Sequence, residues 1–83
     1  MKEEHQINAF LKQSISELLK IDEDSFKITT DLGVVGMDSL SAVMLCGLIE
    51  EQFDIEVDPL EMFELRTIRE VCDAIHPTIN SAR

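Results

Sequence analysis

A single serine, Ser39, stands where a phosphate group could be attached. It lies in the turn Val35–Leu40 (VGMDSL), which leads into a segment with apolar residues at helical spacing. A hydroxyl at the positive, N-terminal end of a helix is in a place where phosphate is well tolerated. The two histidines, His5 and His76, lie near opposite ends of the chain, so the serine has no neighbouring base in the sequence. The pattern therefore favours an attachment point over a catalytic nucleophile.

The other reactive residues do not form a second centre. Cys46 and Cys72 are far apart, without a CxxC motif or a nearby histidine pair, which argues against a zinc or redox site. The sequence also lacks a Ser-His-Asp order and a glycine-rich phosphate loop. We expect a protein that is not an enzyme and has two buried free thiols, as is usual in the cytoplasm. A disulfide between the two cysteines is the less favoured alternative.

Length and charge limit the classes of function. The chain has 83 residues, which is enough for one small domain and too few for a deep substrate pocket. Its net charge of −10 disfavours nucleic acid, because phosphate binding needs clustered Lys and Arg, and it favours partners with basic surfaces. The polar start, Met1–His5, is unlike a signal peptide, and no apolar run reaches membrane-spanning length. We expect a stand-alone, cytoplasmic monomer that binds neither nucleic acid nor membrane.

Hydrophobic spacing and capping signals predict an all-α fold. The pair Asp58-Pro59 marks a helix start, Thr67 to Glu70 fits a capping box, and Pro77 is expected to end the last helix. The chain between the first two helices has no period and must cross the molecule to place Ser39. The prediction is a single domain, residues 1–83, forming a small four-helix bundle with a long first loop and a short third helix. The predicted helices are residues 4–20, 38–52, 58–65 and 67–76, followed by a loose tail, 77–83.

The same spacing predicts which side chains face the core. A glycine inside a helix costs up to ~1 kcal/mol relative to alanine, so Gly47 suggests close packing against a neighbouring helix. The stripe expected to face inward from the second helix is Leu40, Val43, Met44, Gly47 and Leu48, extended by Ile49 and Phe53. The residues expected to pin the long loop onto the core are Phe26, Ile28, Leu32, Val34 and Val35.

Charges are distributed unevenly along the chain. No Lys or Arg occurs between Lys27 and Arg66, whereas this stretch holds more than half of the acidic residues. Those acids surround the serine turn and continue through the second and third predicted helices. A solvated acidic surface is one explanation; we favour a docking surface for basic partners.

Several motifs fall in the order found in one family. They are Gly36, Asp38-Ser39-Leu40, Ile49-Glu50-Glu51-Gln52-Phe53, Ile55-Glu56-Val57, and Met62-Phe63-Glu64 leading to Thr67-Ile68. Together they resemble an acyl or peptidyl carrier protein, over almost the whole domain from the first helix to about Ile75. The tripeptide alone is weak, but its register with the two later motifs makes the resemblance strong.

The resemblance implies a carrier without catalytic residues. Ser39 would hold 4′-phosphopantetheine, transferred from coenzyme A by a phosphopantetheinyl transferase, and acyl groups would be carried on the arm as thioesters. Partners would include an acyl- or aminoacyl-loading enzyme and a ketosynthase or other assembly-line enzymes with basic docking surfaces. The residues expected to dock them are Asp38, Leu40, Met44, Glu50 and Glu51. The open alternatives are an aminoacyl or peptidyl carrier, and an acidic interaction module in which Ser39 merely caps its helix.

Departures from the family pattern affect the choice of pathway. Ser41 and Met44 stand where many fatty-acid carriers have acids that face partner enzymes. Met44 facing the core is an equally weighted alternative. Val34-Val35-Gly36-Met37 stands between Asp31-Leu32-Gly33, which resembles the family's Asp-Leu-Gly, and Asp38. Either the loop is longer than usual, or Val35-Gly36 replaces the common Leu-Gly. The neutral front half of the second helix suggests a partner different from the generic fatty-acid enzymes. The stretch from Met62-Phe63-Glu64 to Thr67-Ile68 resembles carriers of polyketide or nonribosomal peptide assembly more than those of fatty-acid synthesis.

Overall fold

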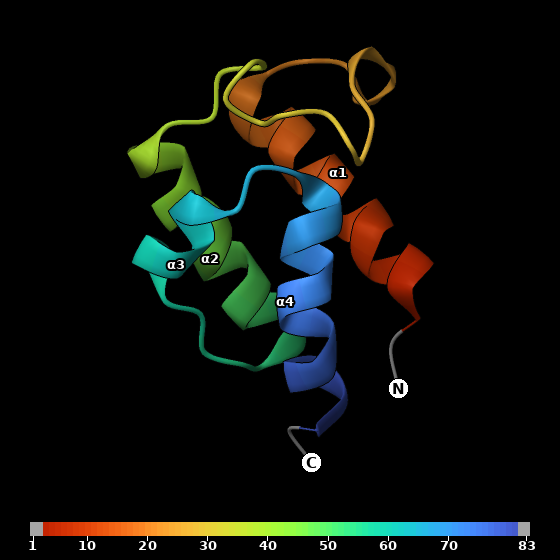
Figure 1. Cartoon of the computed structure of the whole chain (residues 1–83), viewed down its shortest axis with the longest axis vertical. Helices are drawn as coiled ribbons and strands as arrows, with labels where there is room; N and C mark the ends of the chain where they lie inside the picture. Colours follow the sequence, from red (N-terminus) through yellow and green to blue (C-terminus); the bar gives the residue numbers. More distant parts are fainter. Residues whose placement is uncertain (1–2, 82–83) are drawn as a thin grey trace.

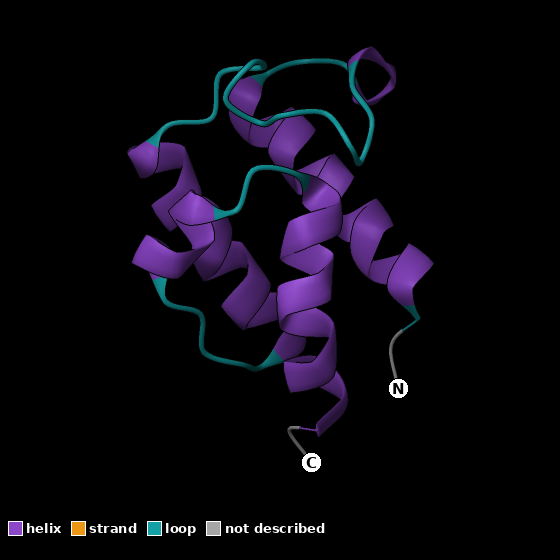
Figure 2. Ribbon diagram, in the orientation of Figure 1, coloured by secondary structure: helices purple, strands orange, loops and turns teal. Residues whose placement is uncertain are grey.

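The computed structural model describes residues 3–81 and is helical throughout its regular parts, with no strand in that range (Figures 1 and 2). Its elements are α1 (Glu4–Leu19), the short 3₁₀ helix η1 (Glu23–Ser25), α2 (Ser39–Phe53), α3 (Pro59–Glu64) and α4 (Ile68–Ser81). Helix α1 packs against α4 and α2, and α3 packs against α2. The all-α fold with four helices, a long first loop and a short third helix is confirmed. None of the described helices is long and apolar enough to cross a membrane.

One stripe of α1 forms the centre of the core. Ile7, Leu11 and Ile15 follow each other at four-residue spacing and are completely buried. Fully burying a side chain of this size stabilises a fold by roughly 1.5–3 kcal/mol. The same core cluster includes Leu45, Cys46 and Ile49 from α2, Met62 from α3, and Ile68, Val71, Cys72 and Ile75 from α4.

Side-chain caps stabilise the N-terminal ends of α3 and α4. Asp58 caps α3, since its carboxylate accepts the backbone N–H of Leu60 at 2.9 Å, and a proline follows at the first helical position. Thr67 accepts the N–H of Glu70 at 3.1 Å, as expected for a capping box. The carboxylate of Glu70, however, accepts the N–H of Arg66 at 2.7 Å, one residue earlier than the box requires. This contact extends the cap into the link between the helices.

The last helix is longer than its sequence suggests. Pro77 lies inside α4, which continues to Ser81, so the predicted tail 77–83 is wrong for residues 77–81; residues 82–83 lie outside the described part. Proline removes one helical hydrogen bond. Ile79 nevertheless packs against the core one turn after buried Ile75, and the side chains of His76 and Asn80 meet at 3.0 Å. These contacts favour one more turn of helix.

The long loop is fastened at several points before it reaches α2. Phe26 and Leu32 are buried, and Ile28 packs against the core with Val35, as predicted. Val34 is 80% exposed, so its predicted role in pinning the loop is wrong. It lies in a run of turns between Leu32 and Val35, and these two residues already reach the core.

Backbone hydrogen bonds tie the same loop to the start of α4. The N–H of Leu32 donates to the carbonyl of Arg66 at 2.7 Å, and the N–H of Arg69 donates to the carbonyl of Ile28 at 3.0 Å. The guanidinium of Arg66 also pairs with Asp31 at 2.8 Å. Exposed ion pairs contribute little, but the backbone bonds fix the path of the loop toward Ser39.

Candidate functional site

Ser39 is the first residue of α2, and its neighbour Asp38 caps that helix. The Asp38 carboxylate accepts the backbone N–H of Ser41 at 2.8 Å, and its carbonyl accepts the N–H of Ala42 at 2.9 Å. The interpretation of Ser39 as a helix cap is therefore wrong, because aspartate performs that role. Ser39 is exposed, and no side-chain hydrogen bond holds its hydroxyl within residues 3–81. The hydroxyl is thus presented to solvent at the positive end of a helix.

The electrostatics at this position come from the cap. The N–H of Ser41, together with its hydroxyl, holds the pKa of Asp38 below the ordinary value for a carboxyl group. Asp38 is therefore ionised at neutral pH directly beside Ser39. The described residues bring together no group of three or more His, Cys, Asp or Glu that could hold a metal ion.

The Asp38 cap should make part of the stability pH-dependent. Because its pKa is lowered in the folded protein, its contribution is complete above the unfolded pKa of about 3.9 and is lost as the pH falls through the lower folded value. Asp38→Asn keeps a capping side chain that cannot ionise. In urea unfolding, the stability gap between wild type and this variant should therefore close between about pH 5 and pH 2. A gap of constant size over this range would contradict the assignment.

The outward face of α2 is apolar, which corrects the prediction for this helix. Ala42, Leu45, Cys46 and Ile49 are buried. The prediction of an inward stripe is correct for its extension, since Ile49 is buried and Phe53 packs against the core, and wrong for the rest, since those residues are exposed: Leu40, Val43, Met44, Gly47 and Leu48. Almost every position from Leu40 to Ile49 is apolar or small, so the period does not select a face. Packing against α1 and α3 selects it instead. The large apolar residues left exposed on this helix are Leu40, Val43, Met44 and Leu48.

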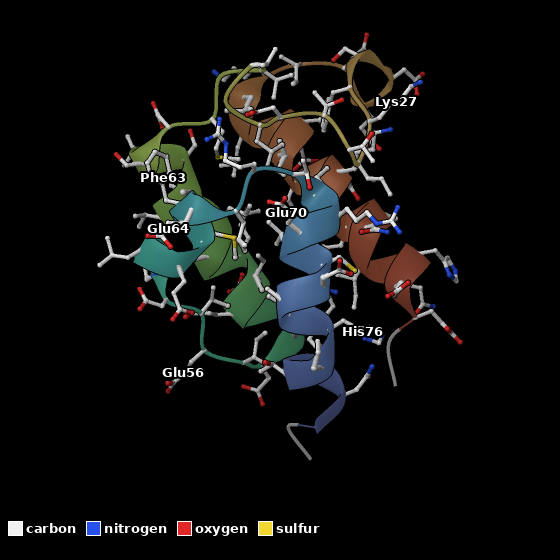
Figure 3. All side chains as sticks on the ribbon, in the orientation of Figure 1. Lys27, Glu56, Phe63, Glu64, Glu70 and His76 are labelled. Atoms are coloured by element: carbon white, nitrogen blue, oxygen red, sulfur yellow. The ribbon has the colours of Figure 1, made fainter. Side chains whose placement is uncertain are left out.

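Exposed apolar side chains continue onto the neighbouring segments. Val34 on the loop, Leu60 on α3 and Phe63 on α3 complete the exposed large apolar residues of the described chain. Phe63 shares a small hollow with Met37 and Ala42, next to the first turn of α2, and Figure 3 shows it on that side of α3. All seven lie within the stretch that lacks Lys and Arg. We call residues 34–63 the apolar-acidic segment.

Sequence reasoning missed the exposure of Val43 and Leu48, which it placed in the core. It listed Leu40 and Met44 as docking residues and also as members of the inward stripe. The structure removes this conflict, since both are at least half exposed, and it excludes the alternative that Met44 faces the core. One signal was available in the sequence: the front half of α2 has almost no polar residues, so some of its apolar side chains had to be exposed.

The two acids at the end of α2 differ in their surroundings. Glu50 is partly buried, and its carboxylate accepts the backbone N–H of Val57 at 2.8 Å, which ties α2 to the loop that follows. Glu51 is exposed. Glu50 thus stabilises the chain's own fold, while Glu51 is available to a partner.

Gly47 has a different environment from the one its sequence position suggested. It lies on the exposed side of α2, and a Cβ atom built on it would meet nothing within 4 Å. The prediction that this glycine allows close packing against a neighbouring helix is therefore wrong.

Both cysteines are buried and free, so the alternative of a disulfide between them is excluded. Burial raises the pKa of the Cys46 thiol and of the Cys72 thiol. Each therefore remains a protonated, weakly reactive thiol at neutral pH.

Comparison with known families gives a match over most of the chain. A family model described as a phosphopantetheine attachment site matches residues 9–75, a range that includes Ser39 and all of α2 and α3.

Two curated proteins are similar in sequence. An acyl carrier protein of Phytoplasma mali is 29% identical over 72 residues, covering 86% of this chain and 86% of that protein. The non-reducing polyketide synthase tazA of Aspergillus terreus is 29% identical over 65 residues, covering 78% of this chain. The chain spans only 2% of the length of that synthase.

Two solved structures share the fold. One is a free-standing peptidyl carrier protein from an uncharacterized secondary metabolic pathway of Acinetobacter baumannii, with a TM-score of 0.87 and 15% identity, covering 95% of this chain and 99% of that one. The other is the HMG-ACPI domain of the CurA module from Lyngbya majuscula, with a TM-score of 0.87 and 20% identity, covering 96% of this chain and 81% of that one. At these identities the likeness concerns the fold.

Proposed function

The chain belongs to the family of carrier proteins with a phosphopantetheine attachment site, and on this basis we propose that Ser39 is the residue that bears the 4′-phosphopantetheine arm. Covalent 4′-phosphopantetheine is the cofactor of this family, and its terminal thiol carries acyl groups as thioesters. The observation that carries the assignment is the exposed Ser39 hydroxyl at the first position of α2, left free because Asp38 caps the helix.

The residues around Ser39 suit attachment by a separate transferase. The Ser39 oxygen would form the new bond to the pantetheine-bearing phosphorus of coenzyme A, and the pyrophosphate bond would break to release the nucleotide. The serine proton would pass to a base of the transferase, since Asp38 is already engaged with Ser41. The chain's own contribution is to present the hydroxyl at a fixed helix end. It acts as substrate and shuttle rather than as a catalyst.

Intact mass tests this proposal. After incubation with coenzyme A, Mg²⁺ and a broad-specificity phosphopantetheinyl transferase, the wild-type chain should gain the mass of one phosphopantetheine. An unchanged mass would contradict the carrier assignment and favour an acidic interaction module instead.

The cargo belongs, in our proposal, to polyketide or related natural-product assembly, with an aminoacyl or peptidyl carrier as the alternative. The front half of α2 supports this choice, because Ser41 and the exposed Met44 replace acids that a fatty-acid carrier would present. Carrier domains interact with synthase enzymes in assembly lines. The partners proposed for this chain are a phosphopantetheinyl transferase, an acyl- or aminoacyl-loading enzyme, and a ketosynthase or other assembly-line enzyme.

Docking in this proposal uses the apolar-acidic segment, with Leu40 and Met44 as apolar contacts and Asp38 and Glu51 as charged ones. The partner surface would be apolar at its centre and basic at its edge. Glu50 is the weakest of the proposed docking residues, because its carboxylate is occupied by the Val57 N–H.

Reversing the charge of Glu51 should slow modification without unfolding the chain. Glu51→Lys is expected to lower kcat/KM for the transferase by severalfold at low salt and by much less at about 0.5 M salt, because screening weakens exposed charge interactions. Steady-state assays at both salt concentrations check this, with unfolding curves as the control. Glu50→Lys should instead lower stability by about 1 kcal/mol or more, since it removes a partner of a backbone N–H. Equal kinetics for wild type and Glu51→Lys at low salt would contradict this docking role.

We also propose that the protein is a monomer and acts in the cytoplasm. The two buried free thiols support a reducing compartment, and the net charge of −10 opposes self-association.

A further inference from the structure

Gly47 destabilises its own helix without a compensating contact inside the chain. In a helix interior, glycine is less favourable than every other residue except proline. A glycine in this position is usually explained by a neighbour that leaves no room for a side chain. Here a Cβ atom would meet nothing within 4 Å, so no group of the described chain requires the glycine. The space that it leaves is on the exposed side of α2.

This space is part of a groove between two helices. The groove has a volume of about 380 Å³ and is lined by Leu18 of α1 and by Met44, Gly47, Leu48 and Glu51 of α2. Three of these side chains are large and apolar, and Glu51 is the one charged side chain among them. The missing side chain at Gly47 deepens the groove where Met44 and Leu48 flank it. A volume of this size accommodates at least one large apolar side chain.

We propose that this groove receives one large apolar side chain of the carrier's partner enzyme, flanked on the partner by Lys or Arg. The proposal rests on the carrier function proposed above. An apolar side chain matches the walls formed by Leu18, Met44 and Leu48, and a basic neighbour matches Glu51. Helix α2 contains no Lys or Arg that would repel such a partner.

The groove lies close enough to Ser39 to be covered by an enzyme that binds this serine in its active site. Gly47 follows Ser39 by eight residues in the same helix, which corresponds to about 12 Å along the helix axis. An enzyme that holds the Ser39 hydroxyl in its active site must therefore cover the adjoining part of α2, which lies within the reach of an ordinary protein interface. A second copy of this chain is a poor occupant, because each copy carries a net charge of −10.

The transferase reaction isolates partner binding from any effect of cargo. Before modification the chain has no arm, so a change in the rate of this first reaction cannot arise from an acyl group lying in the groove. The probe is a broad-specificity phosphopantetheinyl transferase with coenzyme A and Mg²⁺, and the readouts are kcat/KM and the thermal unfolding midpoint of the carrier.

Gly47→Ala should change these two quantities in opposite senses. The midpoint should rise by about 4 °C, because alanine favours the helix and its methyl group meets no neighbour. The kcat/KM should fall by about tenfold, because the same methyl group occupies space that the partner side chain fills. Gly47→Leu should fill more of the groove and lower kcat/KM further. Thr78→Ala, at an exposed position of α4, is the matched control and should raise the midpoint slightly with kcat/KM unchanged.

The possible outcomes separate this inference from the function on which it rests. No modification of the wild type would overturn the carrier assignment itself. If the wild type is modified and both Gly47→Ala and Gly47→Leu have the same kcat/KM as the wild type, the groove proposal alone is overturned. It would also be overturned by a lower midpoint for Gly47→Ala, or by a wild-type dimer in light scattering that Gly47→Leu disrupts, since the groove would then serve the chain's own packing or a second copy.

Discussion

Ser39→Ala is expected to abolish phosphopantetheine attachment completely while leaving the four helices intact. The variant removes the one oxygen that, in our proposal, forms the bond to phosphorus. The fold should survive because Asp38, not Ser39, caps α2, so the loss of stability should stay below the ~1 kcal/mol of a lost helix cap. Alanine is also a favourable residue at the first helical position. Intact mass after the transferase reaction measures attachment, and circular dichroism measures the helical fold.

The control for this prediction lies two residues further along the same helix. Ser41→Ala changes a serine in the first turn of α2 and should still gain one phosphopantetheine. Its hydroxyl assists the Asp38 cap, so it should lose slightly more stability than Ser39→Ala. If Ser39→Ala were still modified, another hydroxyl would carry the arm. If this variant lost its helical fold, its unchanged mass would not identify Ser39 as the attachment site.

Leu45→Ala should strongly destabilise the fold, although sequence spacing assigned this residue to no stripe. Leu45 is 1% exposed and belongs to the core, so its truncation should cost about 2–5 kcal/mol. That is a large part of the roughly 5–10 kcal/mol expected for a domain of this size. Leu40 has the same side chain in the same helix but is 68% exposed, so Leu40→Ala should change the stability by about 0.5 kcal/mol or less. Urea unfolding of the two variants measures the difference.

The same pair also separates folding from docking. Leu40→Ala should fold normally and still lower kcat/KM of the transferase, because Leu40 belongs to the proposed docking surface. If Leu40→Ala proved the more destabilising of the two, the face of α2 assigned by the structure would be inverted, and the arguments about Met44 and Gly47 would fail with it.

The helix ends were predictable because their signals are local. Asp58-Pro59 starts α3 through one side-chain hydrogen bond and one residue without an N–H, and both features can be seen within three residues of sequence. The start of α2 near Ser39 was predicted from the turn and the apolar spacing that follows it, but Asp38 was not identified as the residue that caps it. The end of α4 was not predicted, because continuation through Pro77 depends on Ile79 reaching a core built by distant parts of the chain.

The buried face of α2 could not be predicted from its own residues. Periodicity identifies a buried face only where polar residues mark the opposite one, and the front half of α2 has apolar residues all round. Tertiary packing against α1 and α3 decided the matter. The failed prediction for Gly47 has the same origin, since a glycine on an open helix face cannot be distinguished in sequence from one packed against a neighbouring helix. The position of Ser39 at the start of α2 was predictable because its motif combines a turn with the start of an apolar-periodic segment.

The hydrogen bonds between the long loop and the start of α4 have a consequence for motion. They join Leu32 to Arg66 and Ile28 to Arg69, so the loop before Ser39 and the first turn of α4 should open together as one cooperative unit rather than separately. A bound enzyme that pulls on the serine turn would thus transmit force to α4. Opening of the first turn of α4 would, in turn, be expected to release the loop that leads to Ser39.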